Sequence, residues 1–433
     1  MKYYIIGIKG AGMSTLAQIL FDLGNEVIGY DDNPSYKFTQ DGLDSRGIKI
    51  YYDNYHDLDK DTIVTYSAAF DINHREIVRV KEMGLVVKPY AEIMGTVIDM
   101  FTTIGVSGTH GKTSTSSMIK QILDNSFGCN YFIGAGDGKA SLDKKYYVVE
   151  SDEYNRHFLY YHPEYSIITN IEEEHMEIYK DIDDLKNTFE KFANQTKSLV
   201  VANGDNDVVR SINYKTKVIF YGFNKSNDVV INNLILTNNG CSFEIDYSDN
   251  NYIFDLPIFG KHMVMNAVAA IIISLYIGID IDTINKSLKS FKNAKRRMET
   301  TTIGDTIIID DYAHHPTEIK VTLEAIKQKY PDKKLVVVFR PNTYSRVKDF
   351  YKDFADSLKI ADDIYLTKVL ANRERSEDYP GIDSNMIGDL IDGVKYIEEE
   401  NISLLKPEIG NVVCFMGCAD NSKLISGFSE LLK

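Results

Sequence analysis

Cysteine is scarce in this sequence, which has 4 cysteines among 433 residues, at positions 129, 241, 414 and 418. That number is too small for a disulfide framework, and the spacing of Cys414 and Cys418 does not suit a zinc knuckle. We therefore expect reduced thiols and a cytoplasmic protein. The N-terminus also lacks a secretory signal pattern, because Met1 leads directly into a strand and a glycine turn.

Long hydrophobic runs and basic clusters are lacking as well. The longest apolar run, residues 267–279, is interrupted by Ser274 and Tyr276 and is shorter than the roughly 20 residues that span a bilayer. The net charge is −15 with no dense block of Lys and Arg, which argues against a nucleic-acid or anionic-membrane binder. The 44% apolar content suffices for large cores, and the length suggests three domains. We expect a soluble enzyme that gathers positive charge in pockets.

Residues 102–113 form the most informative stretch of the chain. A β-branched run leads into Gly108-Thr-His-Gly-Lys-Thr113, and a helix-like segment, 114–123, follows. This order is typical of a loop that cradles a nucleotide triphosphate, with Lys112 near the β- and γ-phosphates and the Thr113 hydroxyl on Mg²⁺. The strict motif would place glycine at Val106, so an ordinary turn is the alternative.

The N-terminal residues predict a βαβ unit. A strand leads into a turn with glycines at 7, 10 and 12, and a helix runs to Leu23. A second strand, 26–30, ends at Asp31. Because Thr15 occupies the third position of the dinucleotide pattern, NAD is not the best ligand for this turn. Strands and helices alternate to about residue 99, which predicts a small α/β domain.

Acidic residues and a histidine follow two further predicted strands. The strand 146–150 ends in Glu150, and the strand 165–169 leads to His175. Strand ends of this kind bind ligands in open α/β sheets, so both side chains are candidates for holding Mg²⁺. A solvated carboxylate and an exposed histidine are the alternatives.

The second half of the chain predicts an antiparallel excursion and then another α/β domain. Residues 217–257 read as short strands with turns, and an apolar helix over 263–277 carries Asn266. Arg296 and Arg297 could clamp a phosphate or form a solvated basic loop. The stretch 310–315 contains two aspartates and two histidines between a strand and a helix that begins near Pro316, which indicates a site.

Taken together, the sequence resembles the Mur ligase family nearly end to end. The matching stretches are 7–14, 108–113, 169–176, 203–205, 296–297, 310–318 and 373–374. The resemblance implies a Rossmann-like UDP-sugar-binding domain (1–99), a central P-loop ATP-binding domain with the antiparallel excursion (100–296), and a C-terminal Rossmann-like α/β domain that binds an amino acid (297–433). Domain closure over the site is expected.

The stretch 310–318 resembles one branch of that family most closely. The implied reaction joins L-alanine to UDP-N-acetylmuramate with ATP and Mg²⁺ through an acyl phosphate, as a cytoplasmic step of peptidoglycan synthesis and hence of cell shape and division. The alternative is the recycling branch, which joins a preformed tripeptide. Only small-molecule substrates are expected as partners, with no nucleic acid or membrane, for a monomer or weak homodimer.

Roles for single residues also follow from the resemblance. Lys112 would neutralise the γ-phosphate, and His110 would lie near the muramate carboxylate. His314 would contact alanine and could accept the amine proton. The remaining residues have these implied roles: loop contacts to ATP by Gly108, Thr109 and Gly111; metal by Thr113, Glu150 and His175; adenine, phosphate and ribose by Asn266, Arg297 and Asp311; UDP by Gly10, Gly12, Asp31 and Ser67; alanine by Tyr312 and Arg346.

Some positions depart from the family pattern. Met263, Arg340 and Asn342 replace Asn, Gln and His, which leaves the alanine pocket undefined. Other members carbamylate a lysine at the position of Glu190, so we predict no carbamylated lysine, although Lys191 is adjacent. Two other classes compete with the ligase: a non-catalytic nucleotide-binding partner, and a P-loop GTPase or transporter ATPase. The 310–315 cluster argues against both.

Overall fold

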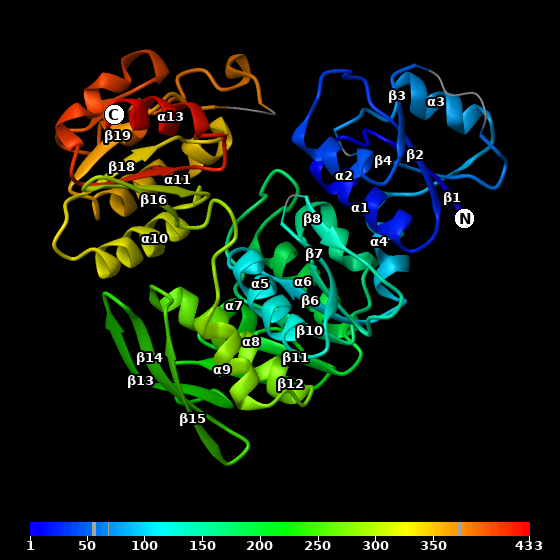
Figure 1. The fold of residues 1–433 in the computed structure, drawn as a ribbon, viewed down its shortest axis with the longest axis horizontal. Helices are drawn as coiled ribbons and strands as arrows, with labels where there is room; N and C mark the ends of the chain where they lie inside the picture. Colours follow the sequence, from blue (N-terminus) through cyan, green and yellow to red (C-terminus); the bar gives the residue numbers. More distant parts are fainter. Residues whose placement is uncertain (54–57, 68, 135, 371–373) are drawn as a thin grey trace. The chain divides into compact units, whose positions relative to one another are not determined.

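The computed structural model describes residues 1–53, 58–67, 69–134, 136–370 and 374–433. The chain divides into two compact units, each described here by itself. One comprises residues 1–232, 244–252 and 265–289, and the other comprises 233–243, 253–264 and 290–433. Three sheets with flanking helices make up the α/β fold, as the sequence predicted (Figure 1). Among the described residues, no helix combines the length and apolarity needed to cross a membrane.

The N-terminal sheet, blue in Figure 1, is parallel with the strand order β3-β2-β1-β4-β5. The order reverses between β1 and β4, and ligands bind outside the carboxyl ends of strands at such a switch point. The elements are β1 Lys2–Ile6, α1 Ala11–Asp22, β2 Glu26–Tyr30, η1 Phe38–Gln40, α2 Asp41–Asp44, β3 Lys49–Tyr51, β4 Ile63–Tyr66, α3 Arg75–Glu82, β5 Val86–Val87 and α4 Tyr90–Ile98.

The central sheet has the order β15-β14-β13-β12-β11-β10-β6-β9-β7-β8. Strands β12 to β7 are parallel, and β6, which leads into the glycine loop, lies between β10 and β9. Their elements are β6 Thr102–Ser107, α5 Lys112–Asp124, β7 Cys129–Ile133, β8 Asp137–Lys139, β9 Tyr146–Glu150, η2 Tyr154–Tyr160, β10 Tyr165–Ile168, α6 Ile182–Gln195, β11 Leu199–Asn203, α7 Asp207–Arg210 and β12 Val218–Gly222.

The predicted excursion consists of three strands at one edge of this sheet, β13 Val229–Thr237, β14 Gly240–Tyr247 and β15 Asn250–Leu256. Ser248 and Asp249 both have positive φ, of 49° and 62°, which suits a two-residue hairpin turn. The apolar helix follows as α8 Lys261–Tyr276, with 267–273 fully buried, and then α9 Ile281–Lys289. The sequence interpretation of residues 267–279 as a buried helix is therefore confirmed for 267–274, whereas Tyr276, at the end of α8, is exposed.

The C-terminal sheet has the order β16-β17-β21-β18-β19-β20, and only the β16–β17 pair is antiparallel among its strands. Alternate residues of β17 enter two cores on opposite faces, Ile307 and Ile309 in one and Ile308 in the other. The elements are β16 Glu299–Ile303, β17 Thr306–Asp311, α10 Pro316–Lys329, β18 Leu335–Phe339, α11 Tyr344–Leu358, β19 Asp363–Leu366, η3 Ser376–Asp378, α12 Asn385–Gly388, β20 Lys395–Tyr396, η4 Glu399–Glu408, β21 Val412–Met416 and α13 Ser422–Glu430.

Candidate active site

The loop between β6 and α5 has a backbone that only glycine fits at two positions. Gly108 has φ +134°, and a Cβ there would lie 2.0 Å from Thr169 Oγ1. Gly111 has φ +83°, and a Cβ there would lie 2.7 Å from Asn266 Oδ1. The loop is thus pressed between the end of β10 and helix α8, which brings the predicted adenine contact, Asn266, against the predicted phosphate loop.

Asn170 fixes the peptide of His110. Its Oδ1 accepts the His110 N–H at 2.8 Å, and its Nδ2 donates to the His110 carbonyl at 3.0 Å. Thr169 Oγ1 donates to the same carbonyl at 2.6 Å. Asn203 Nδ2 in turn donates to the Thr169 carbonyl at 2.8 Å, so the end of β11 supports the end of β10. The sequence analysis assigned no role to Asn170, and the only available signal was its place after a strand beside the loop.

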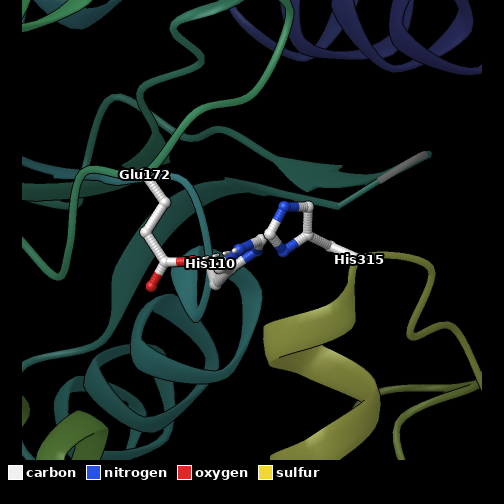
Figure 2. Close-up of side chains that lie close together, drawn as sticks. All are labelled: His110, Glu172 and His315. Carbon is white, nitrogen blue, oxygen red and sulfur yellow. Dashed lines mark ion pairs between the residues drawn. The ribbon is translucent and has the colours of Figure 1, made fainter. Parts of the chain in front are cut away.

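The His110 imidazole forms an ion pair with Glu172, with Nε2 3.5 Å from Oε2 (Figure 2). Glu172 is held because its N–H donates to Thr109 Oγ1 at 2.9 Å. His110 is therefore oriented by two neighbouring strand ends, those of β6 and β10. Figure 2 also draws His315, which belongs to the other unit and is the N-cap residue of α10 there.

Lys112 begins α5 and is held by a carboxylate. Its Nζ lies 2.8 Å from Glu153 Oε2 and donates to the Gly108 carbonyl at 2.6 Å. Burial lowers the pKa of this ammonium, but the charges of Glu153 and Asp152 outweigh burial and leave the pKa raised. Burial also raises the pKa of Glu153, against the opposing effect of Lys112. Lys112 is thus a charged group at neutral pH, and Glu153 is a partner that sequence reasoning missed.

The three predicted metal ligands lie around the same end of the sheet, and two of them share a neighbour. A Cβ on Gly134 would lie 3.9 Å from Thr113 Cγ2, and Gly134 donates its N–H to Glu150 Oε1 at 2.8 Å. His175 pairs with Glu177 at 3.4 Å, and although burial lowers its pKa, Glu177 and Glu174 leave it raised. A hydroxyl and a carboxylate are the hard oxygen ligands that suit Mg²⁺, and because Glu177 pairs with Nδ1 of His175, Nε2 is the nitrogen that would bind a metal.

The N-terminal glycine turn brings its predicted residues to the β1–β4 switch point. A Cβ on Gly10 would lie 3.9 Å from Ser67 Oγ, and Ser67 donates its N–H to the Ile6 carbonyl at 3.0 Å. Asp31 is 5% exposed, and its two oxygens accept the N–H groups of Lys9 and Asn33 at 3.0 and 3.1 Å. Asp31 therefore shapes the turn. Gly12 lies in the first turn of α1.

In the other unit, the 296–298 turn is tied to the end of β17. Asp311 Oδ2 accepts the Met298 N–H at 2.7 Å, and Oδ1 accepts that of Ala313 at 2.9 Å. Burial raises the pKa of Asp311 to about 6. Both carboxylate oxygens thus stabilise backbone, and Arg296 and Met298 have positive φ within this turn.

Arg296 is an anchor rather than a phosphate clamp. Its guanidinium donates to Asp310 Oδ2 at 3.1 Å and to the carbonyls of Gly417, Cys418 and Ala419 at 2.7 to 3.1 Å. The donors needed to grip a phosphate are therefore already engaged, which makes that reading of Arg296 wrong. Arg340, one of the positions that depart from the family pattern, donates to the same loop. Its guanidinium bonds the carbonyl of Asp420 at 2.7 Å.

The predicted alanine residues converge at the end of β17. The Tyr312 ring lies edge-on to His314 with centroids 5.3 Å apart, and His314 Nδ1 lies 3.2 Å from Glu318 Oε2. Arg297 lies 3.8 Å from Glu318 and 5.1 Å from the Tyr312 ring centroid. Burial raises the pKa of the nearby Cys418 thiol, and Arg346 opposes that rise, so Arg346 lies at the same end of the sheet.

Comparisons with known proteins agree with this geometry. Three family models match: Mur ligase family, catalytic domain (2–102), Mur ligase middle domain (106–274) and Mur ligase, glutamate ligase domain (296–419). The chain is 40% identical over 433 residues to the UDP-N-acetylmuramate--L-alanine ligase of Lactiplantibacillus plantarum, covering 100% of this chain and 99% of that protein. The chain belongs to the Mur ligase family.

Solved structures share the fold of this Mur ligase. UDP-N-acetylmuramate-alanine ligase MurC from Thermotoga maritima has a TM-score of 0.81 at 24% identity, covering 100% of this chain and 98% of that chain. A murein peptide ligase from Psychrobacter arcticus has a TM-score of 0.70 at 21% identity, with the same coverage. The predicted three-part α/β architecture is therefore confirmed, while the exact boundaries at 99 and 296 stay a prediction.

Two further sequence predictions concern positions around this site. Glu190 stands at the position of the carbamylated lysine of other members, and its carboxylate accepts the Asn213 N–H at 3.1 Å. The adjacent Lys191 is exposed on α6. The absence of a carbamylated lysine in this Mur ligase stays a prediction. Arg373, which belongs to one of the matching stretches, lies outside the described residues, whereas Glu374 accepts the N–H groups of Tyr344 and Ser345.

Proposed function

We propose that this Mur ligase joins L-alanine to UDP-N-acetylmuramate with hydrolysis of ATP to ADP and phosphate. The observation that carries the proposal is the identity of 40% along the whole chain to a curated enzyme of that name. The described loop, with charged Lys112 at the start of α5 and Asn266 against Gly111, suits a nucleotide triphosphate. We place the reaction in the cytoplasm and in peptidoglycan precursor synthesis.

The chemistry begins at the sugar carboxylate, which is a poor electrophile. One carboxylate oxygen attacks the γ-phosphorus, and the bond from the γ-phosphorus to the β-bridging oxygen breaks. ADP leaves, and the product of this step is an acyl phosphate. Lys112 offsets the charge on the transferring group, and His110, held by Asn170 and Glu172, faces the carboxylate. Thr113, Glu150 and His175 would hold Mg²⁺, which would supply further charge neutralisation.

The second step forms the amide. The alanine amine attacks the acyl carbon, the carbon–oxygen bond to phosphate breaks, and the ammonium proton passes to a base. His314 takes that role through Nε2, since its Nδ1 contacts both the Tyr312 carbonyl at 3.0 Å and Glu318 Oε2 at 3.2 Å. Arg346 pairs with the alanine carboxylate, and Arg297 and Asp311 contact the nucleotide. Asp31, Ser67, Gly10 and Gly12 hold UDP.

An acceptor screen tests this function. Phosphate release is measured with ATP, UDP-N-acetylmuramate and either L-alanine or a tripeptide. We expect release with L-alanine, and release only with the tripeptide would place the chain in the recycling branch instead.

A variant pair tests the nucleotide loop. Lys112→Ala should lower the rate of phosphate release by about 1,000-fold, because positioning and charge neutralisation carry phosphoryl transfer. Lys120→Ala is the matched control, since Lys120 lies further along the same helix, paired with Asp124 at 2.9 Å and over the Tyr131 ring at 4.5 Å. Equal activity of the two variants would contradict the role of Lys112.

A further inference from the structure

Lys9 is a buried cation for which the proposed reaction has no use. It stands between Gly7 and Gly10 in the N-terminal glycine turn, and it is 1% exposed. In a turn of this kind, small residues let the backbone approach a phosphate group. A long charged side chain there is unexpected, and its burial calls for a role.

The ammonium of Lys9 is held by a neighbouring segment. Its Nζ donates to the carbonyls of Asn33 and Ser35 at 2.7 and 2.6 Å, and it lies 5.1 Å from the Tyr52 ring centroid. No carboxylate among the described residues forms an ion pair with it. Because the side chain is directed under residues 33–35, it leaves the glycine turn open to a ligand.

Further bonds join the same segment to the turn and to α1. Thr39 Oγ1 donates to the Lys9 carbonyl at 2.8 Å, and Ser14 Oγ donates to the Thr39 carbonyl at 2.7 Å. The Lys9 N–H donates to Asp31 at 3.0 Å. Residues 33–39 are thus fastened at both ends, with the two charge-assisted bonds of Lys9 as the strongest ties.

We propose that Lys9 is a positioning residue for the UDP sugar: its ammonium clamps residues 33–39 beside the glycine turn, so that the substrate meets a preformed site. The inference rests on the proposed function, which places UDP at this turn. Without the clamp, the segment is open in part of the molecules, and the affinity falls with the fraction that stays closed. The chemical step itself is unaffected once the substrate is bound.

The test compares Lys9→Met with Lys37→Met, which removes an exposed lysine from the same segment. Calorimetry with UDP, steady-state kinetics and hydrogen exchange are measured on the full chain. For Lys9→Met we expect a rise of about tenfold in the UDP dissociation constant and in KM for UDP-N-acetylmuramate, with kcat within about twofold of the wild type. Amides of 33–40 should exchange faster. Lys37→Met should match the wild type.

Several results would overturn the clamp. These are an unchanged UDP affinity in Lys9→Met, an equal loss in both variants, a fall in kcat at constant KM, or weaker binding without faster exchange in 33–40. If Lys9→Met does not fold, Thr39→Val decides, because it loosens the same segment and should weaken UDP binding about threefold. Wild-type chain that binds UDP but releases no phosphate with L-alanine contradicts the proposed function alone, and wild-type chain that binds no UDP contradicts both.

Discussion

At the scale of single residues, the ion pair between Lys112 and Glu153 stabilises a buried cation in the nucleotide loop. The Lys112 side chain is 16% exposed and that of Glu153 is 1% exposed, so neither charge is well hydrated. A buried charge requires a partner, and Glu153 serves as that partner. A triphosphate would bring its own negative charge to Lys112, so the two anions compete for one cation.

Glu153→Gln should therefore destabilise the free protein more than the ATP-bound protein. Removing one member of a buried pair costs about 3 kcal/mol because the other charge stays buried. ATP supplies the missing charge, so the shift in melting temperature on adding ATP should be larger in the variant than in the wild type. Thermal unfolding with and without ATP measures both effects, and an identical ATP shift in the two proteins would refute the competition.

His262 makes a second residue-scale prediction, for stability against pH. Burial and Arg297 lower its pKa to about 4, while Glu318 opposes them, and its Nδ1 has no hydrogen-bond partner among the described residues. The unfolded chain binds this proton below about pH 6.5, whereas the folded chain binds it only below about pH 4. Folded stability should thus rise with pH across that window, by about 3 kcal/mol for this group.

His262→Leu should flatten that rise. Urea unfolding of the variant at pH 4.5 and 7.0 should differ by less than in the wild type, by up to about 3 kcal/mol. The exposed His162, replaced by Gln, is the control and should keep the wild-type difference. An unaltered pH difference in His262→Leu would mean that this imidazole is not buried as described.

At the scale of elements, the active loop depends on how the ends of β6, β9 and β10 meet. Parallel neighbours place Ser107, Glu150 and Ile168 at the same edge of the sheet. The side chains that follow these ends then hold the loop. Asn170 is the main example, since its side chain hydrogen-bonds both the backbone N–H and the backbone carbonyl of His110.

Gly108→Ala should break this arrangement. A Cβ would meet Thr169 Oγ1 at 2.0 Å, so the loop or the end of β10 must move, and activity should fall by at least about 100-fold. Gly24→Ala is the matched control, because Gly24 also has positive φ, of +83°, but nothing lies within 4 Å of the added Cβ. The control should lose about 1 kcal/mol of stability and no activity. Full activity of Gly108→Ala would contradict the described loop.

At the scale of the whole molecule, the sequence was sufficient for the order of the elements and for the strand-end residues. Strand–loop–helix patterns place Lys112 and Glu150 near strand ends of the central sheet and Asp311 at the end of β17, as the structure has them. The roles of Glu153, Asn170 and Lys9 could not be predicted, since each depends on a partner far along the chain, such as Asn33 for Lys9. Arg296 was misjudged for the same reason: three of its acceptors, the carbonyls of 417–419, lie more than 100 residues away.

The proposed reaction depends on the acyl phosphate, and isotope transfer detects this intermediate. UDP-N-acetylmuramate with both carboxylate oxygens replaced by ¹⁸O is incubated with ATP and L-alanine, and the products are analysed by mass spectrometry. The account predicts one ¹⁸O atom in each phosphate released and one in the amide of the alanine-extended product. Phosphate without ¹⁸O, or phosphate release without an alanine adduct, would contradict it.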